Sequence, residues 1–235
     1  MQPHKYKEVK IHSTAVIEGD VEIGEGTEIG AFCYLKGPLV IGKYNKIYTH
    51  VVMGEGPEHR TKPIPVGPII IGDCNHFREF CVVQRGTGDR ITQIGNDCYF
   101  MDHVHLAHDC LIRDSVNIAP NTVLAGHVII DSFSNISLNV SIHQFSTIGA
   151  YSMVGMGGVV TKDIPPFTVV SGNPCQFLKL NEHHFEKLGL SKKDFIEDQD
   201  LLKTNNPKLQ PFFEYFYGQS RRKKFLRVTL NSIYT

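Results

Sequence analysis

The sequence has no net charge, no apolar run of membrane-spanning length and no secretory signal at its start. Its 24 lysines and arginines are balanced by 24 aspartates and glutamates, which argues against a broad nucleic-acid-binding surface. No apolar run approaches the roughly 20 residues that a transmembrane helix needs, and the opening residues MQPHKYKEVK lack an apolar signal-peptide core. We therefore expect a cytoplasmic protein with no transmembrane segment and no nucleic-acid partner.

Paired cysteines of the C-x-x-C type are also missing. The six cysteines are Cys33, Cys74, Cys81, Cys98, Cys110 and Cys175. Several of them occupy the small fifth position of a repeat described below, where a compact buried side chain fits. We expect reduced, buried, structural thiols, and neither disulfides nor a metal centre built on cysteine.

What the sequence does contain is an aliphatic or aromatic residue at every sixth position. An earlier series runs from Ile11 to Met53, and the period returns at Ile71 after a break. Glycine often follows the apolar residue, and a small residue often takes the fifth position. The longest unbroken series is Ile94, Phe100, Leu106, Ile112, Ile118, Leu124, Ile130, Ile136, Ile142, Ile148, Val154 and Val160.

A sustained period of six predicts a solenoid of short parallel strands. A helix would need apolar positions three and four residues apart. Each hexad can bury its apolar side chain only by stacking on another, so the core is expected to be a long column. The period ends near Pro165 and Pro166, so we assign residues 1–175 to a β-helix domain and 176–235 to a helical C-terminal extension.

Two breaks in the period predict external loops. Residues 54–70 carry Pro63, Pro65 and Pro68, which cannot donate hydrogen bonds to a strand ladder. Residues 84–93 read QRGTGDRITQ and are one residue short of the spacing that hexads require. Loops held against a rigid column are where binding residues tend to lie.

The extension is predicted to be helical. A short helix over NEHHFEKLG would end at Gly189, Ser191 would cap a second helix reaching about Leu202, and Pro207 would open a third helix around LQPFFEYFY. The third helix holds a group of aromatic residues that we expect to pack on the β-helix or on a neighbouring subunit. These are Phe212, Phe213, Tyr215, Phe216 and Tyr217.

Histidines gather in the middle of the chain. With three hexads in each coil, Leu106, Leu124 and Ile142 begin hexads on one face of three successive coils, so we expect a vertical stripe of imidazoles spaced by about 4.8 Å. The members of this stripe are His108, His127 and His143, beside His105 and Asp109. A histidine next to a carboxylate can act as a general base, and the N–H of Gly126 can stabilise an oxyanion. This pattern favours acyl transfer by direct attack of a substrate hydroxyl or amine.

Two other interpretations stay open. Zinc binding would use His103 and His108, but the positions two coils below them are Gly67 and Gly72, so a third ligand is not in register. A non-catalytic solenoid would make the histidines incidental. We place both below acyl transfer.

Several motifs together resemble one family. The segments HLAHDC, LAGHV, SIHQF, QRGT and DIPPFTVVSGNP are similar to those of the acyl-carrier-protein-dependent UDP-N-acetylglucosamine O-acyltransferases, which begin lipid A synthesis. The resemblance implies a left-handed parallel β-helix and a homotrimer with active sites between subunits. It also implies that a (3-hydroxy)acyl group is moved from the phosphopantetheine thioester of acyl carrier protein to a UDP-amino sugar, with no metal or other cofactor.

The resemblance also implies roles for individual residues. His108 would be the general base with Asp109 beside it, and Gly126 would supply the oxyanion N–H. His105 would contact the sugar or its phosphates, with Gln84 near the sugar, and His127 and His143 would line the acyl-donor cleft. The other substrate-binding residues would be Arg85, Gln144, Asn181 and Lys187.

Departures from the family pattern concern the acceptor. Gln84 stands where the family commonly has histidine, His59 where an acidic residue is common, and Lys187 and Leu188 where arginines are usual. A nucleotide-linked 3-amino or other amino sugar is therefore an alternative acceptor, and coenzyme A an alternative donor.

Two further features bear on the donor. Met156 matches a position that closes the acyl groove, where a side chain shortens the accepted acyl group. Each methylene that is kept out of the groove loses about 0.8 kcal/mol of favourable burial free energy. A core methionine that fills a gap is the equal alternative. A basic cluster, Arg221, Arg222, Lys223, Lys224 and Arg227, is a candidate docking surface for an acidic carrier protein.

Overall fold

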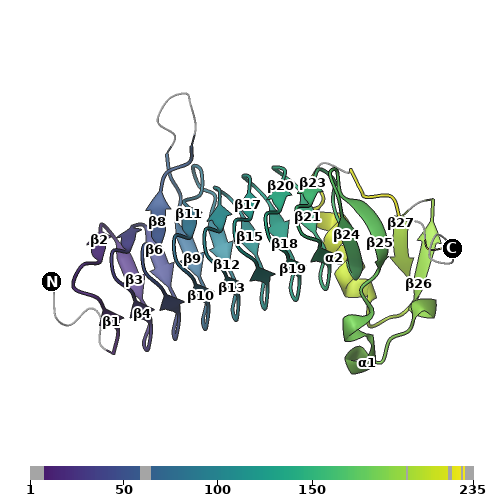
Figure 1. Ribbon diagram of the computed structural model, residues 1–235, viewed down its shortest axis with the longest axis horizontal. Coiled ribbons are helices and arrows are strands. Elements are labelled where there is room, and N and C mark those ends of the chain that lie inside the picture. Colours follow the sequence, from purple (N-terminus) through teal and green to yellow (C-terminus); the bar gives the residue numbers. More distant parts are fainter. Residues whose placement is uncertain (1–7, 59–64, 200, 222–223, 229, 231–235) are drawn as a thin grey trace.

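The structure is a computed structural model that describes residues 8–58, 65–199, 201–221, 224–228 and 230. His59, Arg222 and Lys223 lie outside the described residues. The chain forms an elongated column of short parallel strands, with the first strands at one end and the C-terminal extension at the other (Figure 1). The predicted solenoid is confirmed.

Three sheets, here numbered 1 to 3, form the walls of the column, and each coil contributes one strand to each sheet. Sheet 1 contains β1 (Lys10–Ile11), β4 (Glu28–Ile29), β7 (Lys46–Ile47), β10 (His76–Phe77), β13 (Tyr99–Phe100), β16 (Asn117–Ile118), β19 (Asn135–Ile136), β22 (Met153–Val154), β24 (Thr168–Ser171) and β25 (Gln176–Leu180). Sheet 2 contains β2 (Val16–Glu18), β5 (Tyr34–Lys36), β8 (Val52–Glu55), β11 (Val82–Gln84), β14 (His105–Leu106), β17 (Val123–Leu124), β20 (Ser141–Ile142) and β23 (Val159–Val160). Sheet 3 contains β3 (Val21–Ile23), β6 (Leu39–Ile41), β9 (Ile69–Ile71), β12 (Thr92–Ile94), β15 (Leu111–Ile112), β18 (Ile129–Ile130) and β21 (Thr147–Ile148).

The apolar residue of each hexad points into the column and stacks on its equivalents in the coils above and below. Leu106 pairs with Leu124, which pairs with Ile142, and all three are buried. The rings of Phe77 and Phe100 stack with centroids 4.7 Å apart. Stacking of identical positions is what allows so short a strand to bury its side chain.

Tight corners join the walls. The corner that leads from sheet 2 to sheet 3, called the 2–3 corner here, matters most for function. Its left-handed position is taken in successive coils by Asp109, His127 and Phe145, with φ of 62°, 63° and 64°. Residues other than glycine seldom adopt this conformation, so the backbone of the repeat fixes where these side chains leave the wall.

The two predicted loops leave the column side by side, between β8 and β9 and between β11 and β12. Val66 and Thr87 form an antiparallel bridge. The N–H of Gly67 donates to the carbonyl of Gly86 over 2.9 Å, and the N–H of Gly88 donates to the carbonyl of Pro65. The described parts of the two loops therefore hold each other in place.

The extension is only partly helical. A 3-10 turn, η1 (Glu182–His184), and α1 (Phe185–Leu188) end at Gly189 with φ of 64°, as predicted. The predicted helix from Ser191 to about Leu202 is wrong. Ser191 does make a capping box, but it caps only η2 (Lys192–Asp194), and a hairpin of β26 (Phe195–Asp198) and β27 (Leu201–Thr204) follows.

The hairpin forms in place of the predicted helix because it buries Phe195 and Leu202 in the apolar cluster at the end of the column. Helix α2 (Gln210–Gln219) begins three residues after the predicted Pro207, with Pro211 in its first turn. Phe213 and Phe216 are buried. Phe212 contacts the ring of Tyr151 and Tyr215 contacts Arg113, so packing on the β-helix, the first of the two surfaces predicted for these aromatic residues, is confirmed. The division of the chain at residue 175 stays a prediction, and β24 and β25 pair across it.

The cysteines follow expectation with one exception. All six are free thiols and five are buried, whereas Cys74 is exposed at a corner. Burial raises the pKa of Cys81, Cys98 and Cys110 to about 12, which keeps these thiols protonated and unreactive. No helix in the described part of the chain is long and apolar enough to cross a membrane.

Candidate functional site

The predicted stripe of three histidines is not in register. Because Leu106, Leu124 and Ile142 share a column, His108 aligns with Gly126 and Gln144. His127 instead shares the left-handed position of Asp109 and Phe145. His143 lies one position before Gln144. The hexad count placed the coils correctly, but the three histidines take different positions within the turn.

His108 and His127 nevertheless meet across Asp109 at the 2–3 corner. The two rings contact edge to face, with centroids 5.1 Å apart. His108 Nδ1 lies 2.8 Å from Asp109 Oδ2, and His127 Nε2 lies 3.4 Å from the same oxygen. Asp109 is buried, so its charge acts on both imidazoles with little screening by solvent.

Thr87 holds the Asp109 carboxylate from the loop after β11. Its N–H donates to Oδ1 over 2.8 Å and its hydroxyl to Oδ2 over 2.7 Å. The N–H of Asp109 in turn donates to the hydroxyl of Thr92. Both threonines were missed as site residues in the sequence, although Thr87 closes the QRGT motif that was singled out there.

These contacts fix the ionisation of Asp109. Burial acts to raise the pKa of its carboxyl, but the hydrogen bonds from Thr87 and His108 outweigh burial, and the pKa is lowered. A carboxylate only accepts hydrogen bonds. His108 must therefore donate from Nδ1, which leaves its basic lone pair on Nε2, as a general base requires.

Gly126 lies directly beneath the His108 ring. A Cβ on residue 126 would lie 2.5 Å from Cε1 and 2.7 Å from Nε2 of His108, so any side chain there would displace the imidazole. Residues at the equivalent position of another corner, between sheets 3 and 1, donate their N–H to a side chain of the next coil. Lys43 donates to the Asp73 carboxylate, and Asp73 donates to the Asn96 amide oxygen. Among the described residues the Gly126 N–H has no such acceptor, so it can donate to a developing oxyanion.

Three more predicted site residues lie on sheet 2 or directly after one of its strands. His105 is half-buried on β14, and burial lowers its pKa, while Glu58 acts in the opposite direction. His143 and Gln144 are exposed, and His143 Nδ1 lies 3.0 Å from the Gln144 carbonyl oxygen.

Gln84 and Arg85 lie at the end of β11, next to Thr87. Gln84 is 3 % exposed, and its Oε1 is buried without a hydrogen-bond donor among the described residues. Arg85 donates from Nη1 to the carbonyl of Gly37 over 2.6 Å. Gln84 Oε1 thus accepts no hydrogen bond from the described residues, whereas Arg85 ties the loop to an earlier coil.

Asn181, Lys187 and Met156 do not join His108 within one chain. The Asn181 side chain donates to the carbonyl of Tyr151 over 2.7 Å at the end of the column, and Lys187 is exposed on α1. Met156 lies at the corner between sheets 1 and 2 and is 69 % exposed, which is incompatible with a methionine that fills a gap in the core.

Metal binding has little support from these contacts. The ligand atoms of His108, Asp109 and His127 lie within 4.8 Å of one another, but both oxygens of Asp109 already accept hydrogen bonds. His103 lies at the corner between sheets 1 and 2, stacked on Phe80. It is thus separated from His108 by β14, and the pair of ligands that the zinc alternative would use is not formed.

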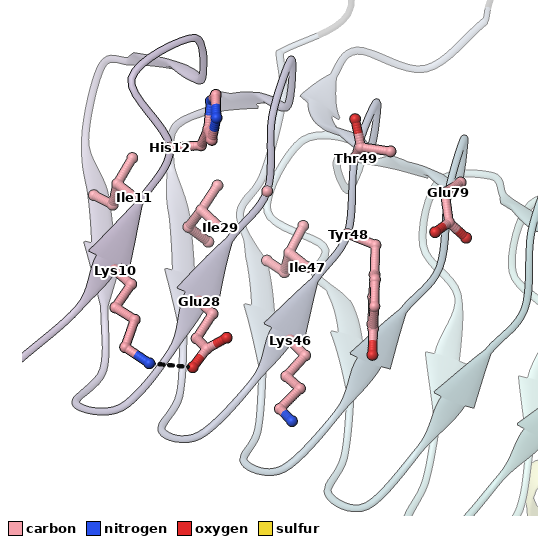
Figure 2. A pocket seen from close by; sticks show the side chains of 11 residues that line it. Lys10, Ile11, His12, Glu28, Ile29, Lys46, Ile47, Tyr48, Thr49 and Glu79 are labelled. Atoms are coloured by element: carbon pink, nitrogen blue, oxygen red, sulfur yellow. Dashed lines mark hydrogen bonds and ion pairs between the residues drawn. The ribbon is translucent and has the colours of Figure 1, made fainter.

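A hollow of about 550 Å³ lies elsewhere, on the outer face of sheet 1 near its first strands. Lys10 and Glu28 form an ion pair of 2.7 Å at its edge, and Tyr48 and Glu79 line it farther along (Figure 2). None of the predicted site residues lines it, so we locate the functional site at the 2–3 corner.

Known proteins resemble the chain in both sequence and structure. The model of the bacterial transferase hexapeptide family (six repeats) matches residues 7–37 and 91–126. The acyl-[acyl-carrier-protein]–UDP-N-acetylglucosamine O-acyltransferase of Halorhodospira halophila is 36 % identical over 210 residues, covering 81 % of this chain and 80 % of the relative. The enzyme of that name from Gloeothece citriformis is 37 % identical over 164 residues, and the match spans 69 % of this chain and 59 % of the relative's length.

Among solved structures, the UDP-N-acetylglucosamine acyltransferase of Francisella novicida superposes with a TM-score of 0.72 and 30 % identity, covering 80 % of this chain and 72 % of that one. Fold and repeats define a left-handed parallel β-helix acyltransferase of the hexapeptide class, as predicted. Within that class, the chain belongs to the family of acyl-[acyl-carrier-protein]–UDP-N-acetylglucosamine O-acyltransferases.

Proposed function

We propose that the protein transfers a (3-hydroxy)acyl group from acyl carrier protein to a UDP-N-acetylglucosamine-type sugar, the first step of lipid A synthesis. The observation that carries the proposal is the chain of contacts from Thr87 through Asp109 to His108, with Gly126 beneath the His108 ring. It supplies a base, a carboxylate that orients the base, and an oxyanion donor in one place.

In the proposed reaction, His108 Nε2 removes the proton from the acceptor hydroxyl as its oxygen attacks the thioester carbonyl. The new C–O bond places negative charge on the carbonyl oxygen, which the Gly126 N–H stabilises. Collapse of this intermediate breaks the C–S bond, and the leaving thiolate takes the proton back from His108. Asp109 stabilises the imidazolium between the two proton transfers. The thioester arrives on the phosphopantetheine arm of the donor, and no metal takes part.

We further infer that the working unit is a homotrimer. The residues assigned to substrate fall into two groups, one at the 2–3 corner and one at the far end of the column with Asn181 and Lys187. A closed ring of three chains would let the second group of one subunit approach the 2–3 corner of its neighbour. In that arrangement Met156 would limit acyl length and the basic cluster would receive the carrier protein. A cytoplasmic location is part of the same proposal.

An amine acceptor is the second candidate, and Gln84 favours it. This glutamine ends β11, where the resemblance leads one to expect histidine near the sugar, and its Oε1 has no hydrogen-bond donor among the described residues. Because Oε1 is buried, the sugar would have to turn the Gln84 side chain in order to reach it. A hydroxyl gives its only proton to His108, whereas the amine of a nucleotide-linked 3-amino sugar keeps an N–H that can donate to the turned amide.

Mass spectrometry of the products tests these proposals. Purified protein is given 3-hydroxyacyl carrier proteins of several lengths, or the matching coenzyme A thioesters, with UDP-N-acetylglucosamine or its 3-amino analogue. We expect an acylated sugar from the wild type and a rate lowered by about 10²–10⁴-fold in His108→Ala. His12→Ala, which changes an exposed histidine of the first coil, serves as the matched control. Equal rates for the two variants would rule out His108 as the base.

A further inference from the structure

The segment after α2 carries an arginine back to the 2–3 corner. The Ser220 hydroxyl donates to the Asp163 carboxylate. The N–H of Asp163 donates to the carbonyl of Lys224, and the N–H of Leu226 donates to the carbonyl of Asp163, both over 2.8 Å. With its flanks anchored on both sides, Arg221 places Nη1 3.4 Å from His127 Nδ1.

This contact determines where the proton of His127 lies. A guanidinium only donates hydrogen bonds and stays charged, so His127 Nδ1 must be an acceptor. The proton is then on Nε2, which lies 3.4 Å from Asp109 Oδ2. The ring has little freedom to turn, since it stacks on Phe145 with centroids 4.3 Å apart and meets the edge of His108.

The charges around His127 also favour its neutral form. Burial is the largest influence and lowers its pKa; Asp109 acts to raise it, while His108, Arg90 and Arg221 act to lower it. Within the part of the chain that the structure describes, these four are the side chains whose charges act on the ring. Arg90 comes from the loop before β12 and Arg221 from the segment after α2, so two cations from distant parts of the sequence oppose the single carboxylate.

We propose that Arg221 is a positioning residue for acyl transfer, which holds His127 as the neutral Nε2–H tautomer so that Asp109 remains the negative partner of His108. The inference rests on the proposed function for its catalytic consequence, but not for the state of His127. Without Arg221, His127 can bind a second proton and pair with Asp109 as an imidazolium. The carboxylate would then support His108 less, and the base would weaken at pH values where His127 is charged.

The state of His127 is tested by NMR on the whole protein without substrates. Imidazole ¹⁵N and ¹³C signals, assigned with His127→Gln, are followed against pH in the wild type, Arg221→Gln and Arg221→Lys. We expect the Nε2–H tautomer in the wild type and a midpoint for His127 about 0.5 to 1 pH unit higher in Arg221→Gln. Arg221→Lys keeps the charge and should move the midpoint less. Lys224→Gln removes a cation from the same segment and should leave the midpoint unchanged.

The catalytic consequence is tested by pH–rate profiles of the same variants. The acidic limb for Arg221→Gln should move to higher pH, with kcat lowered several-fold near pH 6, the KM for the acceptor sugar nearly unchanged, and most of the rate regained at pH 8. An unchanged His127 midpoint in Arg221→Gln overturns the inference. So does a rise in the KM for the acceptor sugar at every pH without a shift of the limb, which would mean that Arg221 binds the sugar directly. If no variant forms product, the proposed function fails while the NMR result still decides the state of His127.

Discussion

At the scale of single residues, Gly126 shows how closely the site is packed. The His108 ring occupies the space where a Cβ would stand. Gly126→Ala should therefore turn or push the imidazole away from its position, and the rate should fall by roughly 10²–10³-fold, comparable to the loss of an oxyanion donor. Steady-state kinetics check this expectation.

The matched change is Ala125→Gly, one position earlier in the same turn, which removes a methyl group and adds no atom near His108. Circular dichroism melts of both variants separate catalytic loss from unfolding. A Gly126→Ala variant with the activity of the wild type would show that the ring can shift without harm.

The Thr87→Val variant tests how far the Thr87 hydroxyl stabilises the ionised carboxylate of Asp109. The change removes the hydroxyl that donates to Oδ2 and keeps the backbone N–H on Oδ1. The pKa of Asp109 is lowered in the folded state, so its contacts stabilise the protein above the pKa of the unfolded chain, and this contribution disappears as pH falls through the folded value. Thr87→Val should raise that pKa and cost about 1 kcal/mol of unfolding free energy at pH 7.

Urea denaturation at pH 7 and at pH 3 measures the effect, with Thr87→Ser as the control that keeps a hydroxyl. The gap between Thr87→Val and wild type should shrink at the lower pH. A gap of the same size at both pH values would assign the loss to packing instead of charge.

At the scale of elements, the sequence allowed the whole repeat to be predicted but only part of the tail. In the column, each strand repeats the same environment, so the positions of Leu106 and Leu124 could be counted from the period alone. The hairpin of β26 and β27 depends on contacts with Phe167 at the column's end, which no local pattern reveals. Ser191 was a genuine helix-start signal, but the capping box that it forms with Asp194 governs a single turn.

The site was predictable to a similar extent. His108, Asp109 and Gly126 were identified from their motifs, and the structure places them together. The stripe failed because a one-residue offset within a turn sends a side chain in a different direction, and the hexad period does not record that offset. The contact between Arg221 and His127 joins residues 94 apart in the sequence, so only the folded chain could reveal it.

Helix α2 packs through Phe216, which is fully buried and contacts the ring of Phe225. Phe216→Ala should lower the free energy of unfolding by about 3–5 kcal/mol, because it removes a large side chain and leaves a cavity. Glu214→Ala, on the exposed side of the same helix, should change it little. Chemical denaturation followed by circular dichroism distinguishes them, and equal stabilities would mean that α2 contributes little to the fold.

At the scale of the whole molecule, the separation of His108 from Lys187 gives a test of the trimer. Two inactive variants, His108→Ala and Lys187→Glu, are unfolded together and refolded as a mixture. If each site combines His108 of one chain with Lys187 of the next, random assembly should restore about a quarter of the sites. Activity of the mixture is compared with each variant refolded alone, and no recovery would place both residues in one chain's site.

The C-terminal extension covers the last coil of the column, and this decides whether molecules can stack end to end. A stack of parallel strands has no natural last member, because the final coil presents the same unpaired ladder edge as every coil before it. Here β25 turns back antiparallel on β24, and Leu226 inserts into the central apolar cluster. These contacts cover the strand edge of the last coil, so no further strands can add at this end. A geometry that could otherwise continue without limit as a fibre therefore stops at a fixed length.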